Sequence, residues 1–212
     1  MKVILLKPKN FSEVVREAAR ALRAGKIVVY PTDTSYALGA VATNKRAIAK
    51  IYKIKEREFK KPVHVMVSSL NAAKKLVRWT PLAEKKFRKH LPGALTPVLE
   101  LKSKNKDLFR LTAETGYLGI RIPKHRFGLA LAKAVGAPIT ATSANPSARL
   151  SGGFDPYSVK DIESQFRNKK FKPDLIVDAG ILKKNKPSTV AKLENGVLTV
   201  LRQGPVVLNK SK

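Results

Sequence analysis

Short apolar runs alternate with amphipathic segments along nearly the whole chain, and this alternation restricts the possible folds more than any other feature. Ile27–Tyr30, Val63–Val67 and Ile139–Thr142 have the length and apolar content of buried strands. Between such runs, apolar residues recur at helical spacing. The pattern predicts an α/β fold in which helices pack on a twisted sheet of mixed parallel and antiparallel strands.

The expected helices and strands follow from this periodicity and from the residues that end each segment. Asn10 with Glu13 has the spacing of a capping box at a helix start, and Gly25 marks the end of that helix. The expected helices cover residues 10–24, 45–53, 69–77, 81–91, 127–135 and 158–166. The expected strands cover residues 1–6, 27–30, 63–67, 96–101, 118–122, 139–142, 175–177, 189–193 and 197–201.

No internal repeat or flexible linker divides the sequence. We therefore expect a single domain over residues 1–212, with a core from about residue 8 to 206 and a frayed end at 207–212. The absence of cysteine excludes thiol nucleophiles, disulfides and iron–sulfur clusters. No apolar run reaches the ~18 residues of a membrane span, and no signal-peptide pattern occurs. The sequence predicts a soluble, cytoplasmic protein without membrane contact.

The charge of the chain is strongly positive. The sequence has 43 Lys and Arg residues against 15 Asp and Glu residues, a formal net charge of +28. Such an excess attracts polyanions, including nucleic acids and nucleotide phosphates. An adaptation for solubility explains the same composition equally well, so charge alone does not decide between an RNA-facing surface and an ordinary one.

Polar residues gather directly after predicted strands, where α/β sheets bind ligands. Lys55 and Arg57 have the side chains that hold phosphate oxygens. Each polar segment also has an ordinary explanation as a turn, a helix cap or a solvated loop. The four segments are Pro31–Gly39, Lys53–Pro62, Thr140–Ser147 with Ser151–Gly153, and Lys186–Val190 with Arg202–Gly204.

Several common catalytic motifs are missing from the sequence. It contains no Gly-x-Ser-x-Gly elbow, no phosphate-binding loop of the Gly-x-x-x-x-Gly-Lys type and no dinucleotide fingerprint. His64, His90 and His125 lack metal-ligand spacing, and we expect them to be surface or core residues. An enzyme of this kind would act by positioning its substrates and stabilising phosphate charge, without a protein nucleophile.

Taken together and in order, the polar segments resemble the signature motifs of the YrdC-like family of L-threonylcarbamoyladenylate synthases. The resemblance runs from about residue 27 to 204 and is to the short form of the family, without an extra C-terminal domain. The matching segments are Pro31–Gly39, Lys55-x-Arg57 with Lys61-Pro62, Pro92-Gly93-x-x-Thr96, Arg121–Pro123, Thr142–Asn145, Val177–Gly180, Ser188–Val190 and Arg202–Gly204.

The resemblance implies a YrdC-like fold with a concave basic cleft, and a nucleotidyltransferase reaction. L-threonine, bicarbonate or carbon dioxide, and ATP would give threonylcarbamoyl-AMP and pyrophosphate. Mg²⁺ would be held through the ATP phosphates, with no ligand from a protein side chain. A downstream threonylcarbamoyl transferase would pass the threonylcarbamoyl group to tRNA. The positive charge of the chain separately suggests that its basic surface contacts tRNA or double-stranded RNA.

Roles for individual residues follow from the same resemblance. ATP binding is implied for Lys55, Arg57, Lys61, Tyr117, Ser143, Asn145, Ser151 and Arg202. Threonine binding is implied for Thr32, Thr34, Arg121 and Ser188, with Arg121 as the partner of the substrate carboxylate. The catalytic residues would be Lys55, Arg57, Ser143 and Asn145.

The sequence departs from the family pattern at four positions. Ala37 stands where a glycine is usual, and Glu56 and Glu58 replace a small residue and a proline beside the phosphate-binding pair. We expect these carboxylates either to pair with neighbouring lysines or to weaken the affinity for ATP. Met66 stands where many members have a histidine, and His64 lies two residues earlier on the same strand face.

A second hypothesis belongs to a different class of function. The +28 charge also suits a YrdC-like protein that binds double-stranded RNA or tRNA and lacks synthase activity. A third hypothesis, a relative acting in hydrogenase maturation, is disfavoured because zinc-finger and acylphosphatase parts are missing from this sequence.

Overall fold

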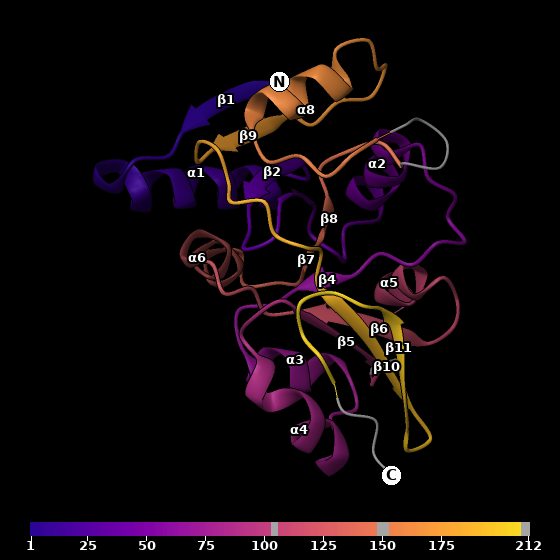
Figure 1. The fold of residues 1–212 in the computed structure, drawn as a ribbon. Helices are drawn as coiled ribbons and strands as arrows, with labels where there is room; N and C mark the ends of the chain where they lie inside the picture. The colour runs from indigo at the N-terminus through magenta and orange to yellow at the C-terminus, as the bar shows by residue number, and fades with distance from the viewer. Residues whose placement is uncertain (103–105, 148–152, 209–212) are drawn as a thin grey trace.

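The strands of the protein form two mixed sheets. The structure is a computed structural model that describes residues 1–102, 106–147 and 153–208. Figure 1 shows β1, β9 and β2 in the upper part of the molecule, β5, β6, β10 and β11 in the lower part, and β4, β7 and β8 between them. The five-stranded sheet has the order β1-β9-β2-β3-β8, and the six-stranded sheet has the order β11-β10-β5-β6-β4-β7.

The first sheet contains β1 (Lys2–Leu5), β2 (Val28–Pro31), β3 (Tyr36–Gly39), β8 (Thr142–Ser143) and β9 (Leu175–Asp178). In it, β9 pairs in parallel with both β1 and β2, whereas β3 pairs antiparallel with β2 and β8. Residues of β2 alternate between two apolar clusters, because successive strand side chains point to opposite faces. Val28 and Tyr30 belong to one cluster and Val29 to the other.

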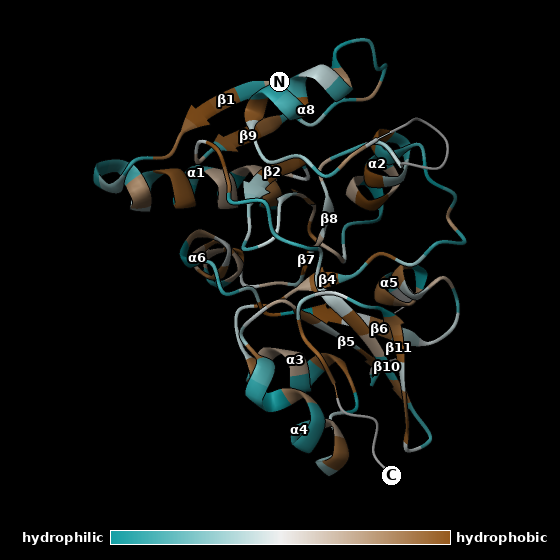
Figure 2. Ribbon diagram, in the orientation of Figure 1, coloured by the Kyte–Doolittle hydropathy of each residue, from teal (hydrophilic) through white to brown (hydrophobic). Residues whose placement is uncertain are grey.

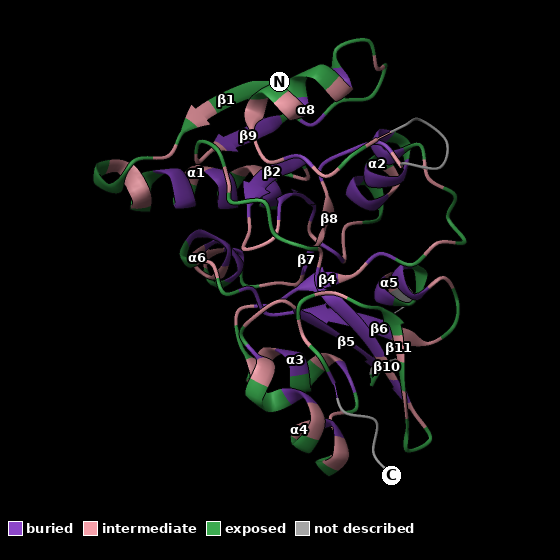
Figure 3. Cartoon of the chain, viewed as in Figure 1, coloured by how far each residue is buried: buried purple, intermediate pink, exposed green. Residues whose placement is uncertain are grey.

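Helices cover both faces of this sheet. The cluster around Val28 and Tyr30 includes residues of α1 (Phe11–Arg23) and α6 (Arg126–Val135). On the other face, the cluster around Val29 includes residues of α2 (Lys45–Lys55) and α8 (Val159–Phe166). Apolar residues on the inner sides of these helices explain why they pack there, and their outer turns are exposed (Figure 3).

The second sheet contains β4 (Val65–Met66), β5 (Leu95–Glu100), β6 (Tyr117–Arg121), β7 (Ile139–Thr140), β10 (Thr189–Glu194) and β11 (Val197–Arg202). Shorter helices, α3 (Leu70–Leu76), α4 (Pro81–Phe87) and α5 (Lys106–Phe109), accompany it. Both sheets combine parallel and antiparallel neighbours. The predicted mixed α/β class is confirmed, with the strands divided between two sheets.

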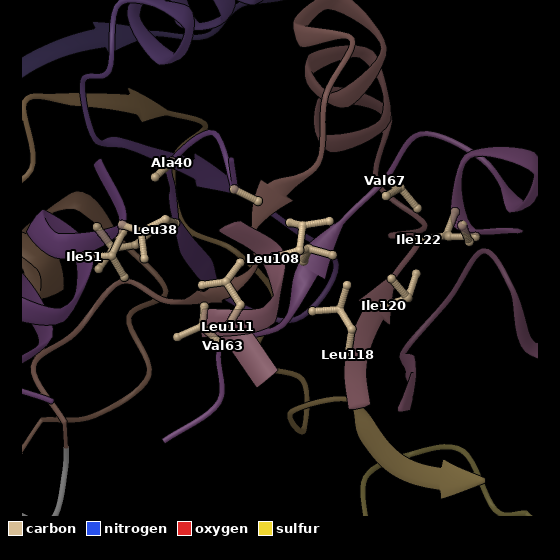
Figure 4. Packing of buried hydrophobic residues seen from close by; sticks show 14 of the residues in the cluster. Leu38, Ala40, Ile51, Val63, Val67, Leu108, Leu111, Leu118, Ile120 and Ile122 are labelled. Atoms are coloured by element: carbon tan, nitrogen blue, oxygen red, sulfur yellow. The ribbon is translucent and has the colours of Figure 1, made fainter. Parts of the chain in front are cut away.

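One apolar cluster connects the two sheets. Figure 4 shows Leu38 of β3 and Ile51 of α2 in the same cluster as Val63, Leu118 and Ile120, which lie in or next to the second sheet. The hydropathy colouring shows the same concentration of apolar residues in the strands, with polar residues in the loops (Figure 2). The single domain stays a prediction. No helix within the described ranges is long and apolar enough to cross a membrane.

Three local predictions need correction. Tyr36–Gly39, expected as a polar loop or a turn that caps a helix, forms strand β3. Asn10 does not cap α1 with its side chain: its Oδ1 accepts from the Lys7 N–H and its Nδ2 donates to the Leu5 carbonyl. Of the expected frayed end, residues 209–212 lie outside the described residues, but Leu208 is buried in the large apolar cluster.

Candidate functional site

Two adjoining hollows contain most of the predicted site residues. A cavity of about 230 Å³ is lined by residues of both sheets, including Ala37 of β3 and Arg121 of β6. A wider hollow of about 500 Å³ lies beside the end of α2. The two hollows share three lining residues, Arg57, Ser143 and Asp155. We call them the inner cavity and the outer hollow.

The inner cavity brings together the four residues implied for threonine and several of those implied for ATP. These residues are Thr32, Thr34, Arg121, Ser188, Arg57, Ser143 and Arg202. The outer hollow is lined by five of the implied ATP ligands, and two of them are shared with the inner cavity. The five are Lys55, Arg57, Lys61, Ser143 and Asn145. Residues far apart in sequence thus converge on one region of the molecule.

One implied ATP ligand among the described residues, Tyr117, does not join this group. Tyr117 begins β6, and Arg121 ends the same strand, so the two lie about 13 Å apart along it. Tyr117 lines a separate hollow with Leu82 and Leu193, and the Lys192 Nζ lies 3.9 Å from the centre of its ring. The structure therefore does not place Tyr117 at the candidate site. Ser151 lies outside the described residues.

Lys55 is buried, and its amine forms hydrogen bonds with other parts of the chain. Its Nζ donates to the carbonyl oxygens of Ser143 (2.7 Å) and Asn145 (2.8 Å) and to the Asn145 Oδ1 (3.2 Å). Its own carbonyl accepts from the Ser147 N–H. Burial, together with the nearby positive charge of Arg57, lowers the pKa of Lys55 to about 7, and Asp155 opposes this shift. Lys55 fixes the segment after β8 to the end of α2, and its three donors are already used.

Arg57 differs from Lys55 because part of its guanidinium has no partner. Its Nη2 donates to the Pro62 carbonyl at 2.8 Å, but its buried Nε–H meets no acceptor in the described part of the chain. Arg57 lines both hollows. A buried unpaired donor is unfavourable unless a ligand satisfies it. Arg57 is therefore the better candidate for direct contact with a phosphate or carboxylate.

Arg121 is held by the backbone on one side and by a carboxylate on another. Its Nη1 donates to the carbonyl oxygens of Gly93 and Leu95, and its Nη2 forms an ion pair with the Asp33 Oδ1 at 2.7 Å. Burial lowers the pKa of Arg121, and Asp33 opposes this shift. Arg121 also lines the inner cavity, and a guanidinium can bind a carboxylate through two parallel hydrogen bonds.

The turn between β2 and β3 is organised by the Thr32 hydroxyl. This oxygen accepts from the N–H groups of Thr34 and Ser35 and donates to the Ser35 carbonyl at 2.6 Å. It also lies 3.1 Å from the Thr34 Oγ1. The turn leads into a strand and presents both threonines to the inner cavity.

The ends of β5, β10 and β11 contribute a second polar group. Ser188 Oγ lies 2.8 Å from Thr96 Oγ1, and Arg202 donates through Nη2 to the same Ser188 Oγ and through Nε to the Ser188 carbonyl. Burial lowers the pKa of Arg202, whereas Asp155 raises it. Arg202 therefore lies with the residues implied for threonine, at the inner cavity.

His64 and Met66 both line the inner cavity, as their shared strand face predicted. The His64 ring packs directly over Gly119, where a Cβ would overlap with it. Burial, with Arg202, Arg57 and Arg121 nearby, lowers the pKa of His64 to about 4. The imidazole is therefore neutral at neutral pH. His64 is thus a buried residue at the wall of the inner cavity, and no catalytic role is assigned to it.

The other departures from the family pattern are accommodated locally. Ala37 lies inside β3 without a positive φ. Glu56 is the C-cap of α2 with φ of 49°, in the left-handed region where small residues are favoured, and its carboxylate lies 2.9 Å from the Lys169 Nζ. Glu58 lies 3.7 Å from the Lys61 Nζ. The predicted pairing of both carboxylates with lysines is confirmed.

Asp33 and Asp155 are site residues to which the sequence analysis gave no role. Asp33 belongs to the first polar segment, so its position directly after a strand was the available signal. Asp155 has no such signal, because no motif contains it and its place on the shared wall depends on how the chain returns after β8. Among the described residues no group of three His, Asp or Glu side chains could hold a metal ion.

The two sheets and the paired hollows define the class: a mixed α/β protein with a polar, cation-lined site where the sheets meet. The Sua5/YciO/YrdC family model, described as "Telomere recombination", matches residues 20–204. The chain belongs to this family.

Individual relatives agree with this assignment. A Methanocaldococcus jannaschii protein is 34% identical over 99% of this chain and 95% of its own length. The Bacillus subtilis threonylcarbamoyl-AMP synthase is 33% identical over 91% of this chain, which spans about half (54%) of that relative. The structure of Pyrococcus abyssi Sua5 complexed with L-threonine is 29% identical, with a TM-score of 0.82 over 96% of this chain and 57% of that one.

Proposed function

We propose that the protein is a threonylcarbamoyl-AMP synthase, a nucleotidyltransferase that joins L-threonine, bicarbonate or carbon dioxide, and ATP. The observation that carries the proposal is the common wall of the two hollows, made by Arg57, Ser143 and Asp155. One hollow offers hydroxyls and a guanidinium, which suit an amino acid. The other offers cationic side chains, which suit a triphosphate. The names of the relatives point to the same reaction.

The proposed chemistry needs no protein nucleophile. The amine of threonine adds to carbon dioxide and loses a proton, which gives a carbamate. A carbamate oxygen then attacks the α-phosphorus of ATP, and the bond from that phosphorus to the oxygen of the β-phosphate breaks. Pyrophosphate leaves with the bonding electrons. The protein contributes alignment across the shared wall and cationic stabilisation of the phosphate charge.

Each substrate has proposed contacts in the structure. The Arg121 guanidinium would bind the threonine carboxylate, with Thr32, Thr34 and Ser188 around the amino acid. The unpaired Nε–H of Arg57 would bind phosphate oxygen, with Lys61 beside it. Lys55 would contribute indirectly, because its hydrogen bonds hold Ser143 and Asn145 in position.

The donor set fits a magnesium ion that arrives with ATP. No described group of three His, Asp or Glu side chains forms a closed metal cage. Mg²⁺ commonly binds through substrate phosphates, several waters and one or two carboxylates. When bound, it would neutralise charge on the phosphates.

Incubation with ATP, Mg²⁺, bicarbonate and L-threonine tests the function through pyrophosphate release. The proposal expects release that depends on threonine. Release that ignores threonine, or none, would favour the RNA-binding alternative or the relative acting in hydrogenase maturation. The proposed reaction serves tRNA modification, so we also propose the cytoplasm as its location and a threonylcarbamoyl transferase as the enzyme that consumes the product.

Replacing Arg121 with alanine should raise the KM for threonine by about tenfold or more, with a smaller effect on the KM for ATP. The lost guanidinium would bind the threonine carboxylate, and charge-assisted hydrogen bonds contribute about 1.5–3 kcal/mol each. Steady-state kinetics with each substrate varied in turn measures both constants. An equal rise in the two KM values would contradict the proposed division of the site.

A direct contact with tRNA is a second proposal, favoured by a basic aromatic surface around Phe171. Phe171 is 40% exposed, and the Nζ atoms of Lys53 and Lys170 lie 5.3 and 5.9 Å from the centre of its ring. Lysines bind phosphates, and an exposed ring can stack on a base. This surface would border the concave basic cleft that the sequence predicts.

For tRNA binding, the logarithm of the affinity should fall linearly with the logarithm of salt concentration. Duplex contacts give a slope of about −0.9 for each neutralised phosphate. Lys170→Ala should reduce the magnitude of the slope by about 1. Lys85→Ala, which removes an exposed lysine of α4, is the control and should leave it unchanged. If wild type and Lys170→Ala had equal slopes of log affinity against log salt, the surface around Phe171 would not contact tRNA.

A further inference from the structure

Asp155 occupies an unusual position in the candidate site. It is one of three residues that line both the inner cavity and the outer hollow. Its neighbours hold it there. A Cβ on Gly153 would overlap with the Pro146 carbonyl, so the chain passes very close to the segment after β8. On the other side, the Pro156 carbonyl accepts from the Tyr36 N–H at 3.0 Å.

The charges around Asp155 are mostly positive. Lys55 and Lys61 lie in the outer hollow, Arg202 and Arg121 in the inner cavity, and Arg57 in both. Of the described residues that line the two hollows, Asp155 is the one carboxylate. Lys55 and Arg202 act on it electrostatically, yet no described cation lies within ion-pair distance of its oxygens. Nor does a described donor form a hydrogen bond with its side chain.

Such a carboxylate would face both proposed substrates, which are anions, without an ion pair of its own to a described cation. The carbamate would approach from the inner cavity and the triphosphate from the outer hollow, and both are anions. A carboxylate on the wall between them repels each one. The repulsion is offset if the carboxylate and a phosphate oxygen bind the same divalent cation, which is how proteins commonly hold Mg²⁺.

We propose that the Asp155 carboxylate is a protein ligand of the divalent cation that enters the site with ATP. This inference rests on the proposed function and replaces the sequence-based expectation that the phosphates alone hold the metal. It requires no chemical step beyond coordination. The alternative is that Asp155 only balances the charge of Lys55 and Arg202.

The test measures ATP binding by calorimetry, with Mn²⁺ as the metal probe or with a chelator in its place. In the wild type, Mn²⁺ should strengthen ATP binding. Asp155→Asn should weaken the binding of Mn²⁺–ATP about tenfold or more while leaving metal-free ATP binding equal or tighter, because a repulsive charge is lost. Glu163→Gln, an exposed neutralisation on α8, is the matched control and should match the wild type.

A second variant keeps the test decisive if Asp155→Asn folds poorly. Asp155→Cys introduces the one thiol in a chain without cysteine. Because thiolates prefer soft metals, this variant should bind Cd²⁺–ATP more tightly than Mg²⁺–ATP, in contrast to the wild type. The same metal dependence in wild type and both variants would overturn the role of Asp155 while leaving the proposed function intact. No ATP binding by the wild type would overturn both.

Discussion

Replacing Arg57 with alanine should lower threonine-dependent pyrophosphate release about 10²-fold or more. The guanidinium lines both hollows and carries a buried Nε–H without a partner. In the proposed reaction it would stabilise negative charge as that charge moves onto the departing pyrophosphate, and removing one such donor commonly has an effect of this size. Single-turnover measurements with saturating ATP and threonine would isolate the chemical step.

Two further variants make the Arg57 result specific. Lys60→Ala removes an exposed charge from the same loop and should retain nearly full activity. Arg57→Lys keeps a positive charge but loses the planar fork, so its activity should fall between those of wild type and Arg57→Ala. If Lys60→Ala and Arg57→Ala were equally impaired, the loop would contribute only its general charge, and the assignment of Arg57 would be wrong.

Replacing Lys55 with methionine should destabilise the protein by roughly 3 kcal/mol and impair activity as well. The change leaves the carbonyls of Ser143 and Asn145 without their donor, and each buried unsatisfied group costs about 1–3 kcal/mol. Methionine fills similar volume, so little of the loss comes from a cavity. Urea unfolding monitored by fluorescence of the single Trp79 would measure the difference.

The difference in unfolding free energy between wild type and Lys55→Met should also depend on pH. The pKa of Lys55 is lowered to about 7 in the folded protein, below its usual value of 10.5. Between these values the unfolded chain binds the proton and the folded chain releases it, so Lys55 adds to stability as the pH rises. The unfolding free energy of wild type should therefore increase relative to Lys55→Met from pH 7 to 10. If the unfolding free energies of wild type and Lys55→Met changed equally with pH, Lys55 would keep its proton in the folded and the unfolded state alike.

Much of the fold follows from local sequence patterns. The predicted helices at 45–53 and 127–135 appear as α2 and α6 with shifts of at most two residues, because apolar spacing marks their buried faces. Gly25 has φ of 75° just beyond α1, as its place after the last apolar residue predicts. These features depend on neighbours within a few residues.

Features that depend on distant partners were not predictable. Tyr36–Gly39 becomes a strand because it pairs with β2 on one side and β8 on the other, and β8 comes about a hundred residues later. The division into two sheets has the same origin, since periodicity does not specify which strands pair. The role that the resemblance implied for Tyr117 likewise gave no information on which end of β6 meets the site.

Lys55 illustrates a signal that was present in the sequence. It lies four residues after Ile51 and seven after Ile48, on the buried face of α2. That spacing indicates a buried amine bound to the chain, whereas the motif alone indicated a phosphate ligand. Asp155 had no comparable pattern, and only the three-dimensional structure brings it to the wall between the hollows.

The most direct test of the proposed function is the mass of the product formed with ¹³C-bicarbonate, ATP, Mg²⁺ and L-threonine. The proposed reaction predicts an adenylate that contains threonine and one ¹³C atom, released together with pyrophosphate. Formation of AMP without a labelled threonine adduct, or unchanged ATP beside intact protein, would contradict it.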